Sequence, residues 1–417
     1  MKNAIYAQSG GVTSVINASA SGVISACRKH SEHIDTLYAA QNGILGVLNE
    51  DLIDTSKEVS DDIEALKHTP GGAFGSCRYK LKGLKDNQAE YARIIEVCRA
   101  HQVRYFFYNG GNDSADTCLK IAQVAKELDY PLQAIHIPKT IDNDLVVTDN
   151  CPGFGSVAKY IATSTLEAGI DLASMYLTST KVFILEVMGR HAGWIAASAA
   201  LARNGSFNSP HIILLPEVTF NQERFLAKVK QVVEQVGFCV IVASEGIKDS
   251  SGELLSSSGS FDAFGHAQLG GVAPLLAQII KQNLGYKYHW GVSDYLQRSA
   301  RHLASKIDVA QAFRLGQSAV ELAIQGKSGI MPYIKRISSD PYIWEIDSVE
   351  LTQVANLEKY LPQDFISTDG FDVTNKCIEY LKPLIEGEDY PPFKNGIPNY
   401  VTLKNLKIAK KLAPWKK

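Results

Sequence analysis

Three short turns in the first third of the chain contain the residue types that phosphate chemistry uses. Residues 9–11 (SGG), 110–114 (GGNDS) and 138–144 (PKTIDND) each follow a short apolar run. Glycines let the backbone approach a phosphate closely, and the N–H groups at the start of a helix favour an anion. A glycine pair is common in ordinary turns, so the first turn alone is a weak signal.

The third turn carries the strongest chemical signal. Lys139 and Thr140 precede two carboxylates, Asp142 and Asp144. Turns rich in Asp and Asn are also common without a ligand. Phosphoryl transfer, however, needs cations on the phosphates, a metal ion and a base near the attacking hydroxyl. In the second turn, Asp113 suits a magnesium phosphate, because magnesium takes one or two carboxylates and keeps most of its waters.

The elements that would position these turns are predicted from apolar runs of strand length. Such runs lie at residues 4–7, 104–108, 134–137, 182–187, 211–215 and 238–243. They are bounded by turns and rich in β-branched and aromatic residues, which predicts buried strands. Stretches of helical period alternate with them, as at residues 272–280. This alternation predicts an α/β fold with mostly parallel sheets, in which ligands bind beyond the carboxyl ends of the strands.

Composition excludes several classes of function. A chain of 417 residues is longer than one core usually organises, so we expect two domains with additions. A net charge of −2 gives no electrostatic case for binding nucleic acid or an anionic membrane. We expect no membrane span and no signal peptide. The seven cysteines are scattered and without a CxxC pair, which favours free thiols in a reducing cytoplasm.

An ordered set of motifs resembles the phosphofructokinase family. The motifs are SGG at 9–11, GGAFGSCR at 71–78, GGNDS at 110–114, PKTIDND at 138–144, EVMGRHAGW at 186–194, SEG at 244–246 and YLQRS at 295–299. They follow the family's order across about residues 1–325, and TIDND and MGRHAG together are specific. The resemblance implies two similar Rossmann-like α/β domains, mostly parallel sheets, an active site in the cleft between the domains, and a C-terminal extension.

The resemblance also implies how the chain is divided. We expect residues 1–150, with about 296–345, to bind the phosphoryl donor. Residues 151–295 would bind the sugar phosphate, and residues 346–417 would form the extension, which carries no usable motif. Because family sites are completed across subunits, we expect a homodimer or homotetramer.

The resemblance assigns individual roles. Asp142 is expected to be the general base for the sugar 1-hydroxyl, with Lys139 and Arg190 as catalytic cations. The expected metal is Mg2+, near Asn112, Asp113 and Asp144. The donor is expected at Gly11, Arg78, Asp113 and Lys139. The sugar phosphate is expected at Thr140, Ile141, Asp142, Lys181, Met188, Gly189, Arg190, Glu245, Tyr295, Leu296, Gln297 and Arg298.

Three positions depart from the family pattern. Asn112 stands where the family usually has a metal-associated aspartate, which leaves the metal shell open. Tyr295 stands where ATP-using members usually have histidine. Lys181 replaces an arginine that, in many relatives, reaches a neighbouring subunit's sugar phosphate, and lysine lacks the bidentate fork.

Two positions favour pyrophosphate over ATP as the donor. ATP-using members carry glycine at the positions of Asp113 and Lys139. An aspartate fills the space of the α-phosphate and adds a negative charge, and repulsion in a partly desolvated cleft costs on the order of several kcal/mol. Lys139 would place an ammonium where the α-phosphate of ATP would lie.

We therefore predict a cytoplasmic, pyrophosphate-dependent 6-phosphofructokinase. It would convert fructose 6-phosphate and pyrophosphate reversibly into fructose 1,6-bisphosphate and phosphate. The alternatives are an ATP-dependent enzyme of the same fold and a non-catalytic regulatory subunit. No residue excludes sedoheptulose 7-phosphate as a further substrate.

Overall fold

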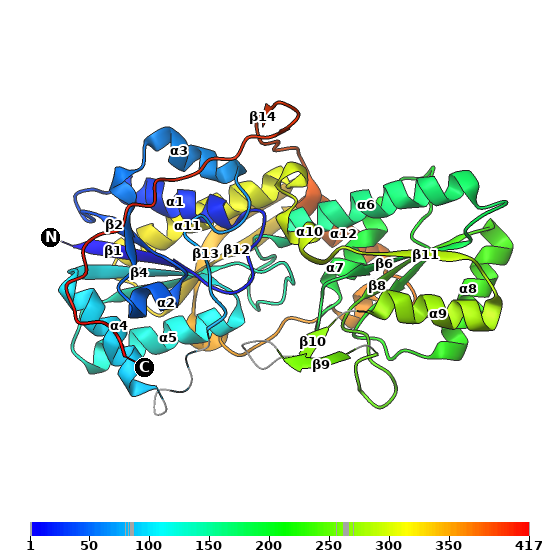
Figure 1. Ribbon diagram of the computed structural model, residues 1–417, viewed down its shortest axis with the longest axis horizontal. Helices are drawn as coiled ribbons and strands as arrows, with labels where there is room; N and C mark the ends of the chain where they lie inside the picture. Colours follow the sequence, from blue (N-terminus) through cyan, green and yellow to red (C-terminus); the bar gives the residue numbers. More distant parts are fainter. Residues whose placement is uncertain are drawn as a thin grey trace. The chain divides into compact units, whose positions relative to one another are not determined.

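The computed structural model describes residues 2–416, apart from residues 80, 82, 84–86, 256, 262–266 and 270. Contacts divide the chain into two compact units. Unit 1 comprises Met1–Gly153, Arg301–Glu358 and Gly387–Lys417, and unit 2 comprises Phe154–Ala300 and Lys359–Glu386. The chain therefore passes between the units four times (Figure 1).

Unit 1 is built on a seven-stranded sheet with the order β13-β12-β5-β4-β1-β2-β3. The five inner strands are parallel, and both edge strands pair antiparallel. The strands are β1 (Asn3–Gln8), β2 (Leu37–Ala40), β3 (Leu52–Asp54), β4 (Val103–Gly110), β5 (Gln133–Pro138), β12 (Ile330–Ser339) and β13 (Tyr342–Glu350).

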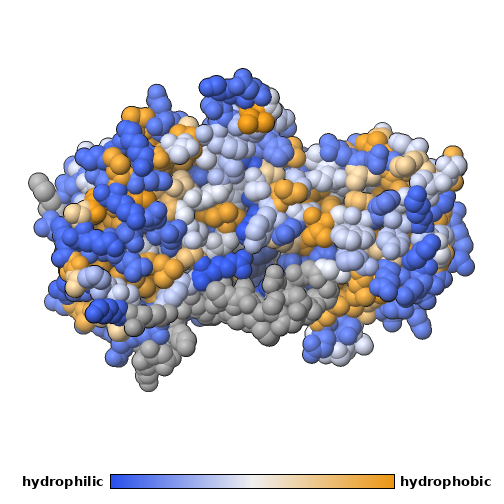
Figure 2. Space-filling model, viewed as in Figure 1, coloured by the Kyte–Doolittle hydropathy of each residue, from blue (hydrophilic) through white to orange (hydrophobic). Residues whose placement is uncertain are grey.

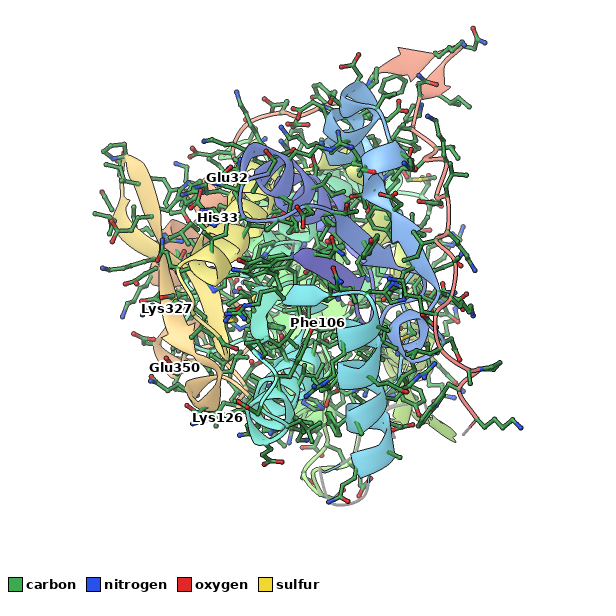
Figure 3. All side chains as sticks on the ribbon, turned by 90° about the vertical axis from the view of Figure 1, so that its left-hand side faces the viewer. Glu32, His33, Phe106, Lys126, Lys327 and Glu350 are labelled. Atoms are coloured by element: carbon green, nitrogen blue, oxygen red, sulfur yellow. The ribbon has the colours of Figure 1, made fainter. Side chains whose placement is uncertain are left out.

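Helices cover both faces of this sheet, so successive strand residues enter two different cores. Ile5 and Ala7 pack in the core beneath α2 (Ile44–Leu48), α4 (Gln88–Ala100) and α5 (Asn112–Glu127). Ala4 and Tyr6 pack beneath α1 (Ile16–Lys29), α3 (Ser60–Ala65) and α11 (Lys306–Ile324). Figure 3 shows Phe106 of β4 inside this arrangement, where it is fully buried, and the charged side chains of residues such as Lys126 at its periphery.

Unit 2 is built on a smaller, four-stranded parallel sheet with the order β11-β6-β8-β7. Its elements are α6 (Phe154–Met175), β6 (Val182–Val187), α7 (Trp194–Ser198), β7 (Ile212–Leu214), α8 (Gln222–Val236), β8 (Cys239–Ser244), β9 (Ser257–Phe261), β10 (Ala267–Leu269), α9 (Val272–Leu284), β11 (Tyr288–Val292), α10 (Asp294–Ser299) and α12 (Asn375–Leu381). One core lies between the sheet and helices α8 and α9.

The predicted C-terminal extension, residues 346–417, is shared between the two units. Residues 346–358 complete unit 1, residues 359–386 pack in unit 2, and residues 387–417 return to unit 1. The returning part contains a short hairpin of β14 (Phe393–Lys394) and β15 (Ile397–Pro398). Figure 2 shows polar and apolar side chains interspersed over the visible face of each unit, as is usual for a protein surface.

The predicted fold class is confirmed. Each apolar run that predicted a strand overlaps a parallel-paired strand of the seven-stranded or the four-stranded sheet, and residues 272–280 lie in α9. All seven cysteines are free thiols. No helix in the described part of the chain has the length and apolar character needed to cross a membrane.

Candidate functional site

The first turn of unit 1 lies between β1 and α1 and is joined to residues 71–78. Gly10 has a φ of 73°, a backbone conformation that favours glycine. Its N–H donates to the Cys77 carbonyl at 3.0 Å, and the Ser76 hydroxyl donates to the Gly10 carbonyl at 2.8 Å. The structure thus brings two of the glycine-rich motifs side by side, with Gly11 beyond the end of β1. Arg78 follows on the same segment and is exposed.

Lys139 joins the first turn to the third. It follows β5, and its side chain is only 3% exposed. The ammonium donates to the Ser9 carbonyl at 2.8 Å and to the Gly11 carbonyl. The Lys139 N–H donates to the Gly110 carbonyl at 3.0 Å, which ties in the second turn as well. The three turns predicted from the sequence therefore meet at one end of the unit 1 sheet, as the rule for parallel strands requires.

Asn112 and Asp113 begin helix α5 in the second turn. The Asn112 amide donates to the Leu357 carbonyl, and its oxygen accepts the Asn356 N–H at 2.6 Å. The amide thus fastens residues 356–357 to the helix start. One lone pair of the oxygen remains for a ligand, and the role of Asn112 at a metal stays a prediction. Asp113 lies in the first helical turn and is half-buried.

Asp142 and Asp144 lie close together in the third turn. Thr140 bridges to Gly153, and its hydroxyl accepts the Asp142 N–H at 3.1 Å. Burial and the neighbouring Asp142 charge raise the pKa of Asp144 to about 7. Its Oδ1 is shielded from solvent and has no hydrogen-bond partner in the described part of the chain. A shielded carboxylate oxygen in this state is suited to a cation.

The described residues of unit 1 form no ready-made metal cage. Among the described residues, no three His, Cys, Asp or Glu side chains come together as a metal site. Among the three predicted metal ligands, Asp113 and Asp144 are the two that offer a charged carboxylate oxygen. This fits magnesium, which uses one or two carboxylates and completes its shell with waters and substrate phosphates.

In unit 2, residues at the ends of β6 and β8 are hydrogen-bonded to one another. Glu245 follows β8, and its Oε1 accepts the Gly189 N–H at 3.3 Å. The Gln297 side chain of α10 accepts the Met188 N–H at 3.3 Å. Burial raises the pKa of Glu245, while the Gly189 N–H and the Arg190 charge oppose that shift. The predicted sugar residues Met188, Gly189, Arg190, Glu245 and Gln297 therefore share one sheet end.

Close backbone contacts shape the turn that carries Arg190. Gly189 has a φ of 130°, and a Cβ there would lie 2.9 Å from the Ala192 carbonyl oxygen. A Cβ at Gly246 would lie 2.0 Å from the Arg190 carbonyl oxygen. Glycine is thus required at position 189, which precedes Arg190, and at position 246, which packs against the Arg190 backbone. This explains why the MGR and SEG motifs occur together.

Tyr295, Leu296 and Arg298 lie on helix α10 near that sheet end. Tyr295 is 59% and Leu296 65% exposed. Arg298 stacks on the Tyr295 ring, with the guanidinium 3.8 Å from the ring centre. Within this chain Tyr295 is therefore a surface residue on which Arg298 stacks, and it is not part of the packed core.

Lys181 lies apart from the other predicted sugar residues of unit 2. It precedes β6, whereas Met188 follows it, so the strand separates them. Its ammonium is 5.3 Å from the centre of the Tyr176 ring. A role of Lys181 in a neighbouring subunit's site stays a prediction. Thr140 and Ile141 belong to unit 1, where Ile141 is buried.

Sequence reasoning missed several residues that support these turns. The Tyr6 hydroxyl accepts hydrogen bonds from the Asn109 amide at 2.8 Å and the Gln8 amide at 3.2 Å, directly beneath the first two turns. In unit 2, Glu217 accepts two backbone N–H groups and was not assigned a role. Its only signal in the sequence is its place just after a strand, which Glu245 shares.

Comparison with known proteins identifies relatives across the whole chain. The family model described as phosphofructokinase matches residues 3–323. A pyrophosphate–fructose 6-phosphate 1-phosphotransferase of Halomonas elongata is 61% identical over 414 residues, which are 99% of each chain. One from Methylococcus capsulatus is 60% identical over 412 residues, 99% of this chain and 98% of the relative. The crystal structure of a pyrophosphate-dependent phosphofructokinase from Nitrosospira multiformis superposes with a TM-score of 0.92, at 58% identity, over 100% of both chains.

Proposed function

Because this chain belongs to the phosphofructokinase family, we propose that it transfers a phosphoryl group from pyrophosphate to the 1-hydroxyl of D-fructose 6-phosphate. The products are fructose 1,6-bisphosphate and phosphate. The relatives that match nearly the whole chain carry this activity in their names, which supports the proposal. The reaction is reversible and belongs to the interconversion of sugar phosphates in glycolysis and gluconeogenesis.

The donor assignment is carried by Lys139. Its buried ammonium is fixed by the carbonyl oxygens of Ser9 and Gly11, at the meeting point of the three turns. A fixed positive charge there suits a compact, highly charged donor. Asp113, on the neighbouring helix start, adds a negative charge that disfavours a third phosphate. Both features favour pyrophosphate over ATP.

The catalytic roles follow from the chemistry of each side chain. Asp142 takes the proton of the 1-hydroxyl as the sugar oxygen attacks the phosphorus, and the bond from that phosphorus to the bridging oxygen breaks. Lys139 balances the charge of the departing phosphate. Arg190 stabilises charge on the transferring group, and Glu245 accepts hydrogen bonds from sugar hydroxyls. Arg298 binds the 6-phosphate.

We assign the metal as Mg2+, held by Asp113 and Asp144. The buried Oδ1 of Asp144 has no hydrogen-bond partner in the described residues, and a cation would satisfy it. When bound, the ion neutralises pyrophosphate oxygens and orients the donor. Chelation should abolish turnover, and Mg2+ should restore it. The free state of all seven thiols supports a reducing cytoplasm, and the family implies a homodimer or homotetramer.

A coupled assay with fructose 6-phosphate and Mg2+ tests the function directly. Pyrophosphate and ATP are compared at equal concentration, because the donor is the sharpest point of the proposal. We expect turnover with pyrophosphate alone. Turnover with ATP alone would overturn the donor assignment while leaving the family intact. No turnover with either donor would favour a non-catalytic regulatory subunit.

A further inference from the structure

We propose that Glu217 is a positioning residue for the arginine turn, residues 188–193, and that it acts by fastening this turn to the C-terminal segment 359–365. The inference rests on the proposed function, since it concerns the turn that carries Arg190. It gives a role to a carboxylate and to a segment that the motifs leave unexplained.

One carboxylate oxygen of Glu217 joins two distant parts of unit 2. Glu217 follows β7, and its Oε1 accepts the Gly193 N–H at 2.9 Å and the Leu361 N–H at 3.0 Å. Gly193 lies three residues after Arg190 and caps helix α7. Leu361 belongs to the segment that enters unit 2 after residue 358. The arginine turn and the C-terminal segment are thus held by the same atom.

The second carboxylate oxygen packs directly against the arginine turn. A Cβ at position 193 would lie 2.7 Å from Glu217 Oε2 and 2.8 Å from Leu215 Cδ2, so glycine permits this approach without a shift of either side chain. Oε2 is shielded from solvent and has no hydrogen-bond partner in the described part of the chain. A shielded carboxylate oxygen without a hydrogen-bond partner is a poor way to stabilise a fold, because its desolvation is costly. Its placement is better explained by the geometry that it imposes on Gly193.

Trp194 makes a second connection between the same two segments. Its indole Nε1–H donates to the Lys359 carbonyl at 3.0 Å. Its ring contacts Phe365 and Tyr380, with centres 6.0 Å and 5.3 Å apart. The C-terminal segment therefore packs against the residue that follows Gly193 and supports the end of the turn from a second direction.

Other residues hold the start of the arginine turn. The Met188 and Gly189 N–H groups donate to Gln297 and Glu245 at 3.3 Å, and the Ser244 hydroxyl donates to the Gly189 carbonyl. The bond from the Gly193 N–H to Glu217 fixes the far end of the turn and limits where the Arg190 side chain can go. If the Arg190 side chain is misplaced, the ligand binds more weakly, even though no residue that contacts the ligand has changed.

Two variants separate positioning from simple destabilisation. Glu217→Ala removes the acceptor, and we expect the KM for fructose 6-phosphate to rise about 10-fold, while the KM for pyrophosphate stays within about 2-fold. Glu217→Gln keeps an acceptor oxygen for both N–H groups, and we expect it to restore the KM to within about 3-fold of wild type. Glu223→Ala, which removes an exposed glutamate on α8, is the matched control and should change neither constant.

Hydrogen exchange gives a readout that does not depend on activity. In Glu217→Ala, amides of residues 188–194 and 359–365 should exchange faster, with the β6 and β8 amides unchanged. Trp194→Phe, which keeps an aromatic ring but loses the indole donor and part of the ring volume, should raise the KM for fructose 6-phosphate about 2- to 5-fold and serves if Glu217→Ala fails to fold. Exchange that is unchanged at 188–194, or a rise in both KM values together, would overturn the proposal. An inactive wild type would overturn the proposed function instead, and the exchange pattern would still decide the positioning role.

Discussion

The two units present their functional side chains in opposite ways. In unit 1, the cation Lys139 is 3% exposed and already bonded to two backbone carbonyls. In unit 2, Tyr295 is 59% exposed, and Arg298 lies stacked on it. Lys139, a proposed donor residue, is thus part of the fold, whereas Tyr295, a proposed sugar-phosphate residue, lies on the surface. Substitution should therefore change stability and activity together at Lys139, and activity alone at Arg298.

The largest effect that bears on this comparison is expected from Asp142. Asp142→Ser should lower kcat by roughly 10²–10⁴-fold with little change in the KM for fructose 6-phosphate, which is the usual size of a lost general base. Steady-state kinetics with both substrates would measure this change. Asp61→Asn, an exposed carboxylate on α3, is the control. Turnover that is unchanged in Asp142→Ser would remove Asp142 from the role of base.

A double variant tests whether Asp113 and Lys139 set the choice of donor. Asp113→Gly combined with Lys139→Gly should lower kcat/KM for pyrophosphate by about 10²-fold, because a charge-assisted contact is lost, and should give measurable turnover with ATP. Parallel assays with the two donors would measure the ratio. If no ATP use appeared in a folded double variant, other residues would also exclude the nucleotide.

A pair of matched variants compares the two units directly. Lys139→Met leaves the Ser9 and Gly11 carbonyls without their buried donor, and the free energy of unfolding should fall by about 1–3 kcal/mol. Arg298→Met should leave the free energy of unfolding within about 0.5 kcal/mol of wild type while raising the KM for fructose 6-phosphate. Urea unfolding and kinetics on both proteins would measure these changes. Equal losses of stability would contradict the comparison.

The smallest expected effect concerns Glu245, a half-buried carboxylate of unit 2. Burial raises its pKa above the value in the unfolded chain, so its contribution to stability is fully present below the unfolded pKa and is lost as pH rises through the folded pKa. Glu245→Gln cannot ionise and keeps an acceptor for the Gly189 N–H. It should match wild type in acid and become the more stable protein toward neutral pH, at the cost of sugar affinity. Urea midpoints measured across that pH range would show the crossover, and a constant difference would contradict it.

Local patterns predicted the parts of the structure that local forces decide. Strands β1, β4, β5 and β6 follow from short apolar runs, and the turns after them follow from glycine and from the rule for parallel strand ends. These features depend on a few neighbouring residues. The family motifs then placed the turns in order along the chain.

Partners that are distant in the sequence could not be predicted from it. The contact of Lys139 with Ser9 spans 130 residues, and that of Asn112 with Leu357 spans 245. The hydrogen bond from the Leu361 N–H to Glu217 spans 144 residues. Such contacts depend on how whole elements pack, and no local period encodes them. The division of residues 346–417 between the two units has no signal in the sequence for the same reason.

The repeated passage of the chain between units has a consequence during synthesis. Strand β5 ends at Pro138, and its neighbours α11 and β12 begin at Lys306 and Ile330. At roughly 5–20 residues per second, a ribosome takes about 10–30 s to make the intervening residues 139–305. Throughout that time the growing chain exposes the free edge of β5 and the apolar face that α11 later covers. The first unit to leave the ribosome is thus the last to close, and slow translation of the second lengthens the period in which nascent chains can aggregate.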